Sequence, residues 1–395
     1  MPITRRRFAM GASLSVGAAA LARPALADTS PIVIGYPAAL TGPSSAPGVG
    51  NNRGVTYAVE TINAAGGVKG RKIEVVTRDT QGDPTKAVNA VQEMMASYTV
   101  HAIWGPNNSG ESLATTPIIS RRNIPNIHSC GIASLIDPKK FPNAFRISPS
   151  NDQAADPPRL YCQKILKINE VAIIGDSTGF GTMMVGDSTS NFKQNGAQVV
   201  YQAQIDATQP DMMPDMLRMR QAGAKAIVVW TVSTGMIARM LNARGAMGWD
   251  VPFVGHQAMG SGEVGKLLDK PANWEKVYNL GFRSCSFDES GKLPPRTQEF
   301  VDRVKGKIPL DDTSLWWVVS AYDAIELIAK AVAETGSSSP KDVIDYWNSL
   351  RKYPGLFGDY TYTVDNHNGY PTDEIVMSLA NSARDGSFTL APGYG

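Results

Sequence analysis

The sequence predicts an α/β protein built from two doubly wound lobes, each with a largely parallel sheet. Three observations support this prediction. Short runs rich in β-branched residues alternate with segments whose apolar residues recur at helical spacing, which is typical of βαβ units. The alternation is interrupted once, over the Pro-, Asn- and Ser-rich residues 145–152, and then restarts. A chain of 395 residues is also longer than one small hydrophobic core requires.

The first series supplies four strands and the helices between them. We expect strands at residues 32–36, 73–79, 102–104 and 124–127. Apolar residues recur at helical spacing from position 55 to position 62, and Gly66 and Gly67 end this helix. The next helix begins after Asp83, an N-cap residue that is followed by Pro84 in the first turn.

The second series repeats the pattern. We expect its strands at residues 171–175, 198–201, 226–231 and 252–255. Gly196 and Gly223 end helices that lie between these strands. Residues 314–335 then form one strongly apolar helix, and short strands at 358–364 and 375–379 close the chain.

The N-terminus has the features of a cleaved export signal. Three arginines at positions 5–7 precede an uncharged run over residues 11–21, and the triplet Ala25-Leu26-Ala27 follows. The adjacent arginines are typical of the twin-arginine route. The alternative is a membrane anchor, but a run of about ten residues is roughly half of what a spanning helix needs. We expect cleavage after Ala27 and a periplasmic mature chain.

Charge and cysteine content exclude several classes of function. The signal holds four arginines and no acid, so its removal changes the formal charge from +2 to −2. Such a near-balance provides no electrostatic footprint for nucleic acid. The three cysteines, Cys130, Cys162 and Cys285, allow at most one disulfide, and neither they nor the four histidines show a metal-binding spacing. We therefore expect no metal and no cofactor.

The loops after the predicted strands indicate a ligand-binding cleft. Parallel sheets of this kind bind ligands at the carboxyl ends of their strands. Gly, Ser, Thr and Asn are frequent in these loops, which cover residues 38–47, 105–110, 129–135, 175–181, 231–235 and 255–260. Ser109 stands where a helix begins, and its hydroxyl beside free backbone N–H groups suits a carboxylate. On residue type alone, a plain helix N-cap is the favoured alternative for Ser109.

One motif suggests an esterase. Residues 175–179 match G-x-S-x-G directly after a strand, which is the setting of a hydrolase nucleophile. Ser177 would then need Asp211 and either His256 or His367 as partners, but no oxyanion motif of the HGGG type is present. We keep a serine esterase as a remote alternative and expect a protein that is not an enzyme.

A second motif approximates a phosphate-binding loop. Residues 260–266 fit most of the pattern, but Leu267 stands where a Ser or Thr should bind magnesium. The segment is better explained as the start of a helix with solvated charges.

Several runs, in the right order, resemble a known family over nearly the whole mature chain. They are ETINAAGGVKGRKI at 60–73, DPTKA at 83–87, WGP at 104–106, FRISP at 145–149 and AYDA at 321–324. The sequence is similar to the leucine/isoleucine/valine-binding family of type I periplasmic binding proteins, the substrate-binding components of ABC importers.

This resemblance implies two lobes joined by a three-crossing hinge. It implies that lobe 1 comprises residues 30–147 plus 281–358, and lobe 2 residues 148–280 plus 359–395. Closure of the hinge would bury a small-molecule ligand, and a permease of the inner membrane would be the partner of a monomeric protein. A sensory protein that docks to a receptor uses the same lobes, so the sequence leaves that alternative open.

The resemblance also implies site residues. In the family a Ser after the Gly-Pro loop holds a ligand carboxylate, and Ser109 matches it. Phe180 and Trp317 match aromatic positions on the two lobes, and Ile132 and Ser233 replace a usual Thr and a frequent Tyr. The residues that we expect to contact the ligand are Ser44, Asn108, Ser109, Cys130, Gly131, Ile132, Phe180, Thr231, Ser233, His256, Gln257 and Trp317.

One departure from the family bears on the ligand. The family's amino-acid binders carry an acid where this chain has Gln257, and we expect no carboxylate nearby before Glu263. A buried ammonium group without a carboxylate partner is costly. We therefore expect an aromatic or other organic acid, with an amide or a hydrophobic or branched-chain amino acid as the alternative.

Overall fold

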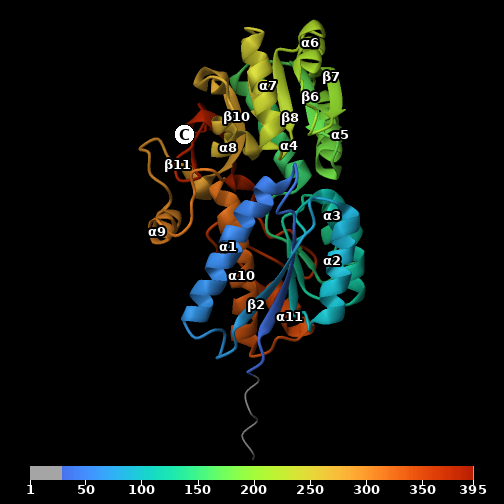
Figure 1. Ribbon diagram of the computed structural model, residues 1–395, viewed down its shortest axis with the longest axis vertical. Helices are drawn as coiled ribbons and strands as arrows, with labels where there is room; N and C mark the ends of the chain where they lie inside the picture. Colours follow the sequence, from blue (N-terminus) through green and yellow to red (C-terminus); the bar gives the residue numbers. More distant parts are fainter. Residues whose placement is uncertain (1–28, 395) are drawn as a thin grey trace, which may run out of the picture.

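The computed structural model describes residues 29–394, and the chain folds into two lobes stacked along its long axis (Figure 1). The expected signal, residues 1–27, lies outside the described residues. Each lobe contains one main sheet, so the predicted fold class of two doubly wound α/β lobes is confirmed. Within residues 29–394, no helix is long and apolar enough to cross a membrane.

The first sheet is entirely parallel, in the order β2-β1-β3-β4-β5. Its strands are β1 (Ile32–Ala38), β2 (Ile73–Asp79), β3 (Ala102–Trp104), β4 (Asn126–His128) and β5 (Ala144–Arg146). Helices flank both faces of this sheet, as the doubly wound pattern requires (Figure 1). They are α1 (Ser45–Ala64), α2 (Pro84–Ser97), α3 (Ser109–Arg121), α10 (Leu315–Thr335) and α11 (Pro340–Ser349).

The second sheet has the order β14-β10-β9-β8-β6-β7, and only the β10–β14 pair is antiparallel. Its strands are β6 (Glu170–Asp176), β7 (Gln198–Ile205), β8 (Ala226–Trp230), β9 (Phe253–Gly255), β10 (Val277–Phe282) and β14 (Ile375–Leu379). The helices of this lobe are α4 (Asn151–Leu160), α5 (Gly179–Gln194), α6 (Met213–Gln221), α7 (Thr234–Ala246) and α8 (Gly262–Lys266).

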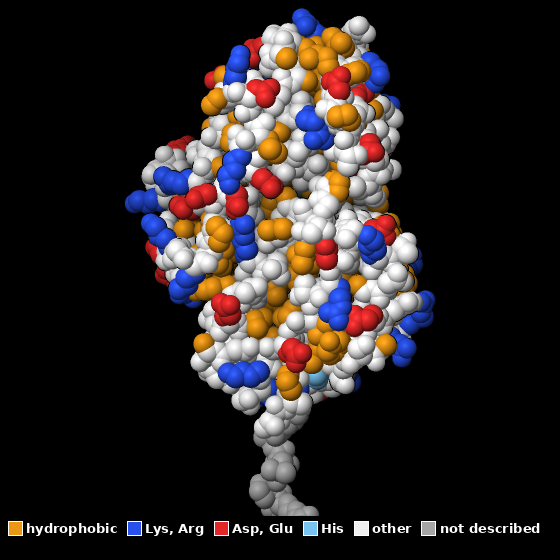
Figure 2. Space-filling view, viewed as in Figure 1, with side chains coloured by type: hydrophobic (Ala, Val, Ile, Leu, Met, Phe, Trp, Pro, Cys, Tyr) orange, Lys and Arg blue, Asp and Glu red, His pale blue; other side chains and the backbone are white. Residues whose placement is uncertain are grey.

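Smaller elements lie at the side of the molecule and near the chain crossings. They are β11 (Ser286–Phe287), α9 (Pro295–Val304), β12 (Tyr353–Pro354), β13 (Asp359–Tyr360) and β15 (Phe388–Thr389). On the face shown in Figure 2, basic and acidic side chains are interspersed without a patch of one sign. This distribution agrees with the absence of a nucleic-acid footprint in the composition.

The strand expected at residues 358–364 is wrong beyond its first residues. Only Asp359 and Tyr360 pair with a neighbouring strand. The chain then turns inward, because the ring of Tyr362 packs edge-on against Phe145 with 5.3 Å between ring centroids. The Tyr362 hydroxyl donates to the carbonyl oxygen of Arg146 over 3.0 Å. Burial of one aromatic side chain therefore outweighs the β-propensity of the segment.

These contacts also bear on where the chain passes between lobes. The Arg146 N–H donates to the carbonyl oxygen of His367, and the His367 ring stacks on Phe145 at 3.8 Å. The segment from Tyr362 to Gly369 therefore packs against β5 of the first sheet, whereas the Tyr370 ring contacts Phe282 at the end of β10. We propose that the third crossing lies between Tyr370 and the start of β14 at Ile375, later than the boundary at 358 that we expected.

Asp323 of α10 ties this returning segment to the core. Its carboxylate accepts hydrogen bonds from the backbone N–H groups of Leu356 (2.9 Å) and Phe357 (2.8 Å) and from the hydroxyl of Tyr360 (2.8 Å). Asp323 is only 4% exposed, so its two oxygens satisfy three donors that water does not reach. The Asp323 side chain of α10 therefore fixes the segment that leads to the third crossing that we propose.

We predict that Asp323→Ala destabilises the protein by about 3–5 kcal/mol, because three buried donors lose their acceptor. Denaturation in guanidinium chloride, followed by far-UV circular dichroism, measures this change. Asp345→Ala is the control, since Asp345 pairs only with Lys341 on the exposed face of α11, and we expect a change of less than about 0.5 kcal/mol. Equal effects of the two substitutions would contradict the assigned role.

Candidate functional site

A cleft of about 1000 Å³, counted with its open mouth, lies between the two lobes. Its lining comes from the carboxyl ends of strands in both sheets, including Tyr36 and Ala38 of β1 and Trp230 of β8. Five helices also begin at the cleft: α1, α3, α4, α5 and α10 contribute residues of their first turns to the lining. Helix N-termini carry partial positive charge, so this convergence favours an anionic ligand group.

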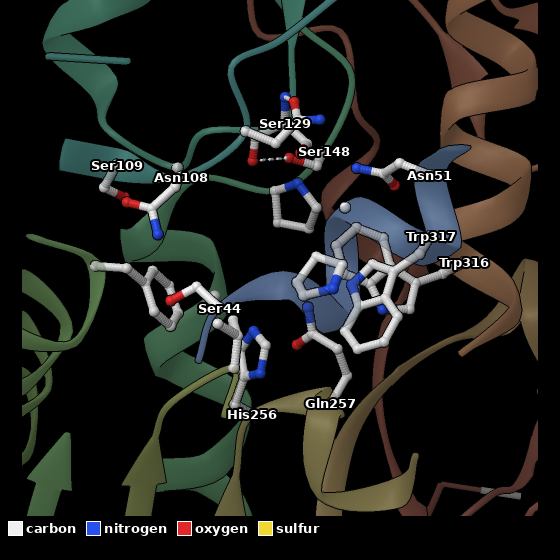
Figure 3. A pocket seen from close by; sticks show the side chains of 18 of the residues that line it. Ser44, Asn51, Asn108, Ser109, Ser129, Ser148, His256, Gln257, Trp316 and Trp317 are labelled. Atoms are coloured by element: carbon white, nitrogen blue, oxygen red, sulfur yellow. Dashed lines mark hydrogen bonds between the residues drawn. The ribbon is translucent and has the colours of Figure 1, made fainter. Parts of the chain in front are cut away.

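Ser109 and Asn108 form the polar end of the cleft (Figure 3). The Asn108 side chain caps α3 by accepting a hydrogen bond from the Gly110 N–H over 3.1 Å. Ser109 is thus the first residue of the helix, whereas Asn108 is its N-cap. The N-cap role that residue type alone favoured for Ser109 is therefore wrong. The Ser109 hydroxyl lies at the N-terminus of a 13-residue helix, beside backbone N–H groups that lack helical acceptors. The geometry suits recognition of a carboxylate.

The loops behind this end are fixed by their own hydrogen bonds. The Ser129 N–H donates to Asn107 Oδ1 over 2.9 Å, and the Ser148 hydroxyl donates to the Ser129 carbonyl over 2.8 Å (Figure 3). Gly131 lies against Asn151, where a Cβ atom would approach the Asn151 side-chain oxygen to 2.1 Å. A glycine is required here because the N-terminus of α4 approaches the loop so closely. The polar end is therefore preformed.

Aromatic side chains line the rest of the cleft. Trp316 and Trp317, in the first turn of α10, lie with ring centroids 5.9 Å apart and planes tilted by 51°. Phe180 of α5 meets the His256 ring edge-on at 5.1 Å. The Nε1–H groups of both tryptophans are buried without an acceptor among the described residues. The walls thus combine apolar ring surface with unused hydrogen-bond donors.

Two carboxamides face the cleft between these ends. Gln257 and Asn51 are 7% and 2% exposed, and the side-chain oxygen of each lacks a donor among the described residues. Figure 3 places Gln257 below the tryptophan pair and Asn51 on the opposite side of it. A carboxamide offers both a donor and an acceptor. These two residues therefore provide neutral hydrogen-bonding groups to a polar substituent on a ligand.

Few titratable groups line the cleft. Burial lowers the pKa of His256 to about 3, and its Nδ1 accepts from the Ala258 N–H over 3.2 Å, so the ring is neutral. No Lys, Arg or Asp of residues 29–394 belongs to the lining. The one carboxyl group in it is Glu111, in the first turn of α3, whose pKa is raised to about 7, chiefly by burial. The cleft therefore contains one carboxyl group, at Glu111, that the sequence analysis did not place there.

Eight of the twelve expected ligand residues line the cleft together. They are Ser44, Asn108, Ser109, Gly131, Phe180, His256, Gln257 and Trp317. The other four lie behind the cleft wall, where each has a structural role. Cys130 and Ile132 pack in a small apolar cluster, with the Cys130 thiol 3.8 Å from the Ser109 hydroxyl.

Thr231 and Ser233 hold the loop after β8. The Thr231 hydroxyl donates to Asp176 Oδ2 over 2.6 Å and accepts from the Ser233 N–H over 3.0 Å. The Ser233 hydroxyl caps α7 by accepting from the Met236 N–H over 3.3 Å. Both hydroxyls are thus engaged in positioning the loop, and we no longer expect them to contact the ligand.

Several lining residues were missed by the sequence reasoning. Tyr36, Asn51, Glu111, Ser148 and Trp316 are among them. Asn51 is a buried polar residue within an amphipathic helix, and this irregularity was the available signal. Glu111 was hidden because an acid in the first turn is ordinary for a helix N-terminus.

The two lobes touch on both sides of the cleft. At the junction of α3 and α5, a Cβ atom on Gly179 would lie 2.9 Å from the Gly110 nitrogen and 3.0 Å from its Cα. On the other side, Ser261 donates to the carbonyl oxygen of Asp312 over 3.2 Å, and a Cβ atom on Gly262 would lie 1.8 Å from the Asp311 carbonyl oxygen. Glycine at both contacts allows backbone to meet backbone, so the structure shows a closed arrangement.

The esterase arrangement is not assembled in the described part of the chain. Ser177 is exposed and does not line the cleft, whereas His256 is buried within it. His367 packs against Phe145 of the first lobe and Asp211 is exposed. The G-x-S-x-G pattern instead contains Thr178, which caps α5 by accepting from the Gly181 N–H.

The described residues offer neither a metal cluster nor a disulfide. Among residues 29–394, no group of three or more His, Cys, Asp or Glu side chains gathers in a way that could hold a metal ion. The three cysteines are free and buried.

Comparison with known proteins connects this cleft to a family. The sequence profile described as "Periplasmic binding protein" matches residues 31–380. This chain belongs to the periplasmic binding protein family. A curated relative is the leucine-, isoleucine-, valine-, threonine-, and alanine-binding protein of Pseudomonas aeruginosa, 24% identical over 319 residues, which cover 81% of this chain and 82% of the relative.

Solved structures of the family share the fold of this periplasmic binding protein. A type 1 periplasmic binding protein from Bordetella pertussis superposes with a TM-score of 0.79 at 25% identity, covering 88% of this chain and 96% of that one. An ABC-transporter solute-binding protein from Rhodopseudomonas palustris, solved with 4-hydroxybenzoate, has a TM-score of 0.73 at 19% identity and covers 92% and 95% of the two chains.

We predict that Gly179→Val holds the lobes apart, because a Cβ atom at this position would already lie 2.9 Å from the Gly110 nitrogen. Small-angle X-ray scattering measures the radius of gyration, which should exceed that of the parent protein. Gly186→Val is the matched control, since Gly186 also lies on α5 but has no neighbour within 4 Å of its Cβ position. A radius of gyration equal to that of the parent protein would contradict contact between the lobes at this point.

Proposed function

We propose that this periplasmic binding protein is the extracytoplasmic substrate-binding component of an ABC importer and captures a small carboxylate-bearing solute, an aromatic or other organic acid, by hinge closure. The observation that carries the proposal is the cleft itself. Helix N-termini and the Ser109 hydroxyl stand at one end of it, and aromatic walls without a cation or an aspartate make up the rest. Its membrane partner would be an inner-membrane permease that recognises the closed form of a monomer.

The polar end supports an anionic ligand group. The N-terminus of α3 supplies backbone N–H groups that lack helical acceptors, and α1, α4 and α5 also begin at the cleft, whereas the first turn of α10 carries the tryptophan pair of the wall. Each N-terminus stabilises an anion by about 0.3–1 kcal/mol at exposed sites, and by more where water is excluded. A ligand carboxylate therefore finds stabilisation here without a basic side chain.

The walls support a ligand with a flat apolar body. Trp316 and Trp317 of α10 and Phe180 of α5 present ring surface to the cleft from different lobes. Aromatic pairs in offset or edge-on contact contribute about 0.5–1.5 kcal/mol beyond the burial of their surface. The Gln257 carboxamide adds a neutral partner for a hydroxyl or amide substituent.

Position 257 argues against an α-amino acid as the preferred ligand. Gln257 carries no charge, and Glu263, the next acid along the chain, is exposed and accepts a hydrogen bond from the Thr234 hydroxyl outside the lining. An amino-acid binder of the family would carry an acid at position 257 to pair with the ligand's ammonium group. In this chain a buried ammonium group would meet the neutral Gln257 there, which is costly. The Rhodopseudomonas relative, solved with 4-hydroxybenzoate, supports an aromatic acid as a ligand of this fold.

A hydrophobic or branched-chain amino acid is the second candidate, because the Pseudomonas relative is named as a leucine-, isoleucine-, valine-, threonine-, and alanine-binding protein. Delivery of the chain to the periplasm by a twin-arginine signal cleaved after Ala27 belongs to the same proposal. A sensory role would use the same cleft with a receptor in place of the permease.

We predict that benzoate or 4-hydroxybenzoate raises the melting temperature more than leucine or valine does. A ligand at a hundred times its Kd stabilises the folded state by about 2.7 kcal/mol, which corresponds to a shift of roughly 3–6 °C for a chain of this size. Differential scanning fluorimetry of the purified mature chain measures it. A large shift with leucine and none with either aromatic acid would overturn the organic-acid assignment.

We predict that Ser109→Ala weakens the binding of benzoate or 4-hydroxybenzoate about tenfold, because one hydrogen bond to a charged group contributes about 1.5–3 kcal/mol. Isothermal titration calorimetry measures Kd for both proteins. Ser349→Ala, on the exposed end of α11, is the control and should leave Kd unchanged. An unchanged Kd in the Ser109 variant would place the ligand carboxylate elsewhere.

A further inference from the structure

Glu111 is the one cleft-lining residue whose chemistry the proposed function does not yet use. It lies in the first turn of α3, two residues after Ser109, and its side chain is 1% exposed. Its Oε1 atom has no hydrogen-bond donor among the described residues. A buried carboxyl oxygen without a partner is costly, so its presence at the edge of a ligand cleft calls for a partner that arrives with the ligand.

The groups around Glu111 make an ionised carboxylate unfavourable. Asp83, the N-cap of α2, and Asp79, at the end of β2, both act on it with like charge, and the nearby Thr80 hydroxyl is the one group that acts to lower its pKa. Tyr36 of β1 also lies within electrostatic reach. Neither a lysine nor an arginine contributes to its environment.

Both neighbouring acids accept hydrogen bonds of their own. Asp79 accepts from the Thr41 hydroxyl and from the Leu40 and Gln81 N–H groups, and its pKa is lowered although partial burial acts to raise it. Asp83 accepts from the Lys86 N–H at the start of α2. Asp79 therefore keeps its negative charge more readily than a free aspartate, which disfavours a further charge on Glu111.

We propose that Glu111 is protonated when the ligand carboxylate binds beside Ser109, so that capture of the anion takes up one proton from solvent. This inference rests on the proposed function. Two carboxylates that share a buried site do not both remain ionised. A neutral Glu111 supplies an O–H donor to the ligand side of the cleft, and this donor takes the place of the basic side chain that the lining lacks.

The proposal fixes the direction of the pH dependence. The ligand-free pKa of Glu111 is about 7, raised first by burial and then by Asp83 and Asp79. Below that pH the side chain already carries its proton, so affinity for an anion is independent of pH. Above it, each pH unit should weaken binding about tenfold, because a proton must be bound first. An ionised Glu111 that paired with a ligand ammonium would show the opposite slope.

The decisive experiment is titration calorimetry of the mature chain with benzoate, from about pH 6 to about pH 8.5, in buffers of different ionisation enthalpy. We expect a Kd that rises above about pH 7 and an uptake approaching one proton per benzoate at the upper end of this range. Benzamide, which has the same ring and no charge, should bind without proton uptake. In Glu111→Gln the pH dependence and the uptake should both disappear, and Glu60→Gln, on the exposed face of α1, should behave as the parent protein.

The outcomes separate this inference from the proposed function. If benzoate and 4-hydroxybenzoate fail to bind at any pH, the proposed ligand class fails and the proton coupling fails with it. If they bind with a flat pH profile or without proton uptake, the ligand class stands and the role of Glu111 is overturned. A Kd that improves with rising pH and is lost in Glu111→Gln would show an ionised carboxylate instead.

Thermal unfolding without ligand supplies a second test. Because the folded-state pKa of Glu111 is raised from 4.5 to about 7, stability is lost as pH rises through this interval and the loss is complete above it. Glu111→Gln should therefore gain stability relative to the parent between about pH 5 and about pH 7. Parallel pH profiles of the two proteins would show that Glu111 is ionised throughout, which would overturn the proposal.

Discussion

The direction of the strands is the constraint on which the site depends. Parallel strands in each sheet end at one edge, and the two lobes are joined so that these edges face each other (Figure 1). Loops that follow several of these strands, and the N-termini of the helices after them, are thereby brought to the space between the lobes. The partial positive charge of the cleft thus comes from backbone rather than from basic side chains. This origin explains how a lining without Lys or Arg in the described chain can suit a carboxylate.

A cleft without fixed cations has a consequence for selectivity. Hydroxyls, carboxamides and indole N–H groups form directional hydrogen bonds but carry no net charge. A ligand is therefore selected by the placement of its polar atoms and by the fit of its apolar body. A buried site that hydrogen-bonds a ligand group rejects analogues lacking that group, because its own polar atoms then remain unpaired. The unpartnered atoms of Gln257, Asn51 and the tryptophan pair are groups of this kind.

Much of the fold followed from periodicity, because strands buried on both faces and their helices leave strong local patterns. β2 was placed at its observed bounds, and α2 begins at the predicted cap and proline. The strand predicted at residues 358–364 does not continue after Tyr360, because the conformation of that segment is set by its contact with the distant Phe145. Local β-propensity does not record such a contact. The position that we propose for the third crossing depends on the same long-range packing, so the sequence did not predict it.

The site was predictable to the extent that its residues follow strands. Ser109 and Gln257 stand directly after strand ends, so topology alone brings them together. Thr231 and Ser233 occupy equivalent loop positions, but their hydroxyls turn into the loop, and only coordinates reveal which way a hydroxyl points. Glu111 carried no distinctive signal, because its importance comes from burial among Asp79 and Asp83, which lie on another strand and helix.

Closure and electrostatics act on the same end of the cleft. The Gly110–Gly179 contact lies at the start of α3, between Asn108–Ser109 and Glu111 along the chain. When these backbones meet, water is excluded from the polar end, and electrostatic interactions there strengthen as the local dielectric constant falls. An anion that neutralises the helix N-termini then stabilises the closed state more than the open one, and only this difference drives closure. The same exclusion of water raises the cost of a second charge, so the closed state favours a proton on Glu111.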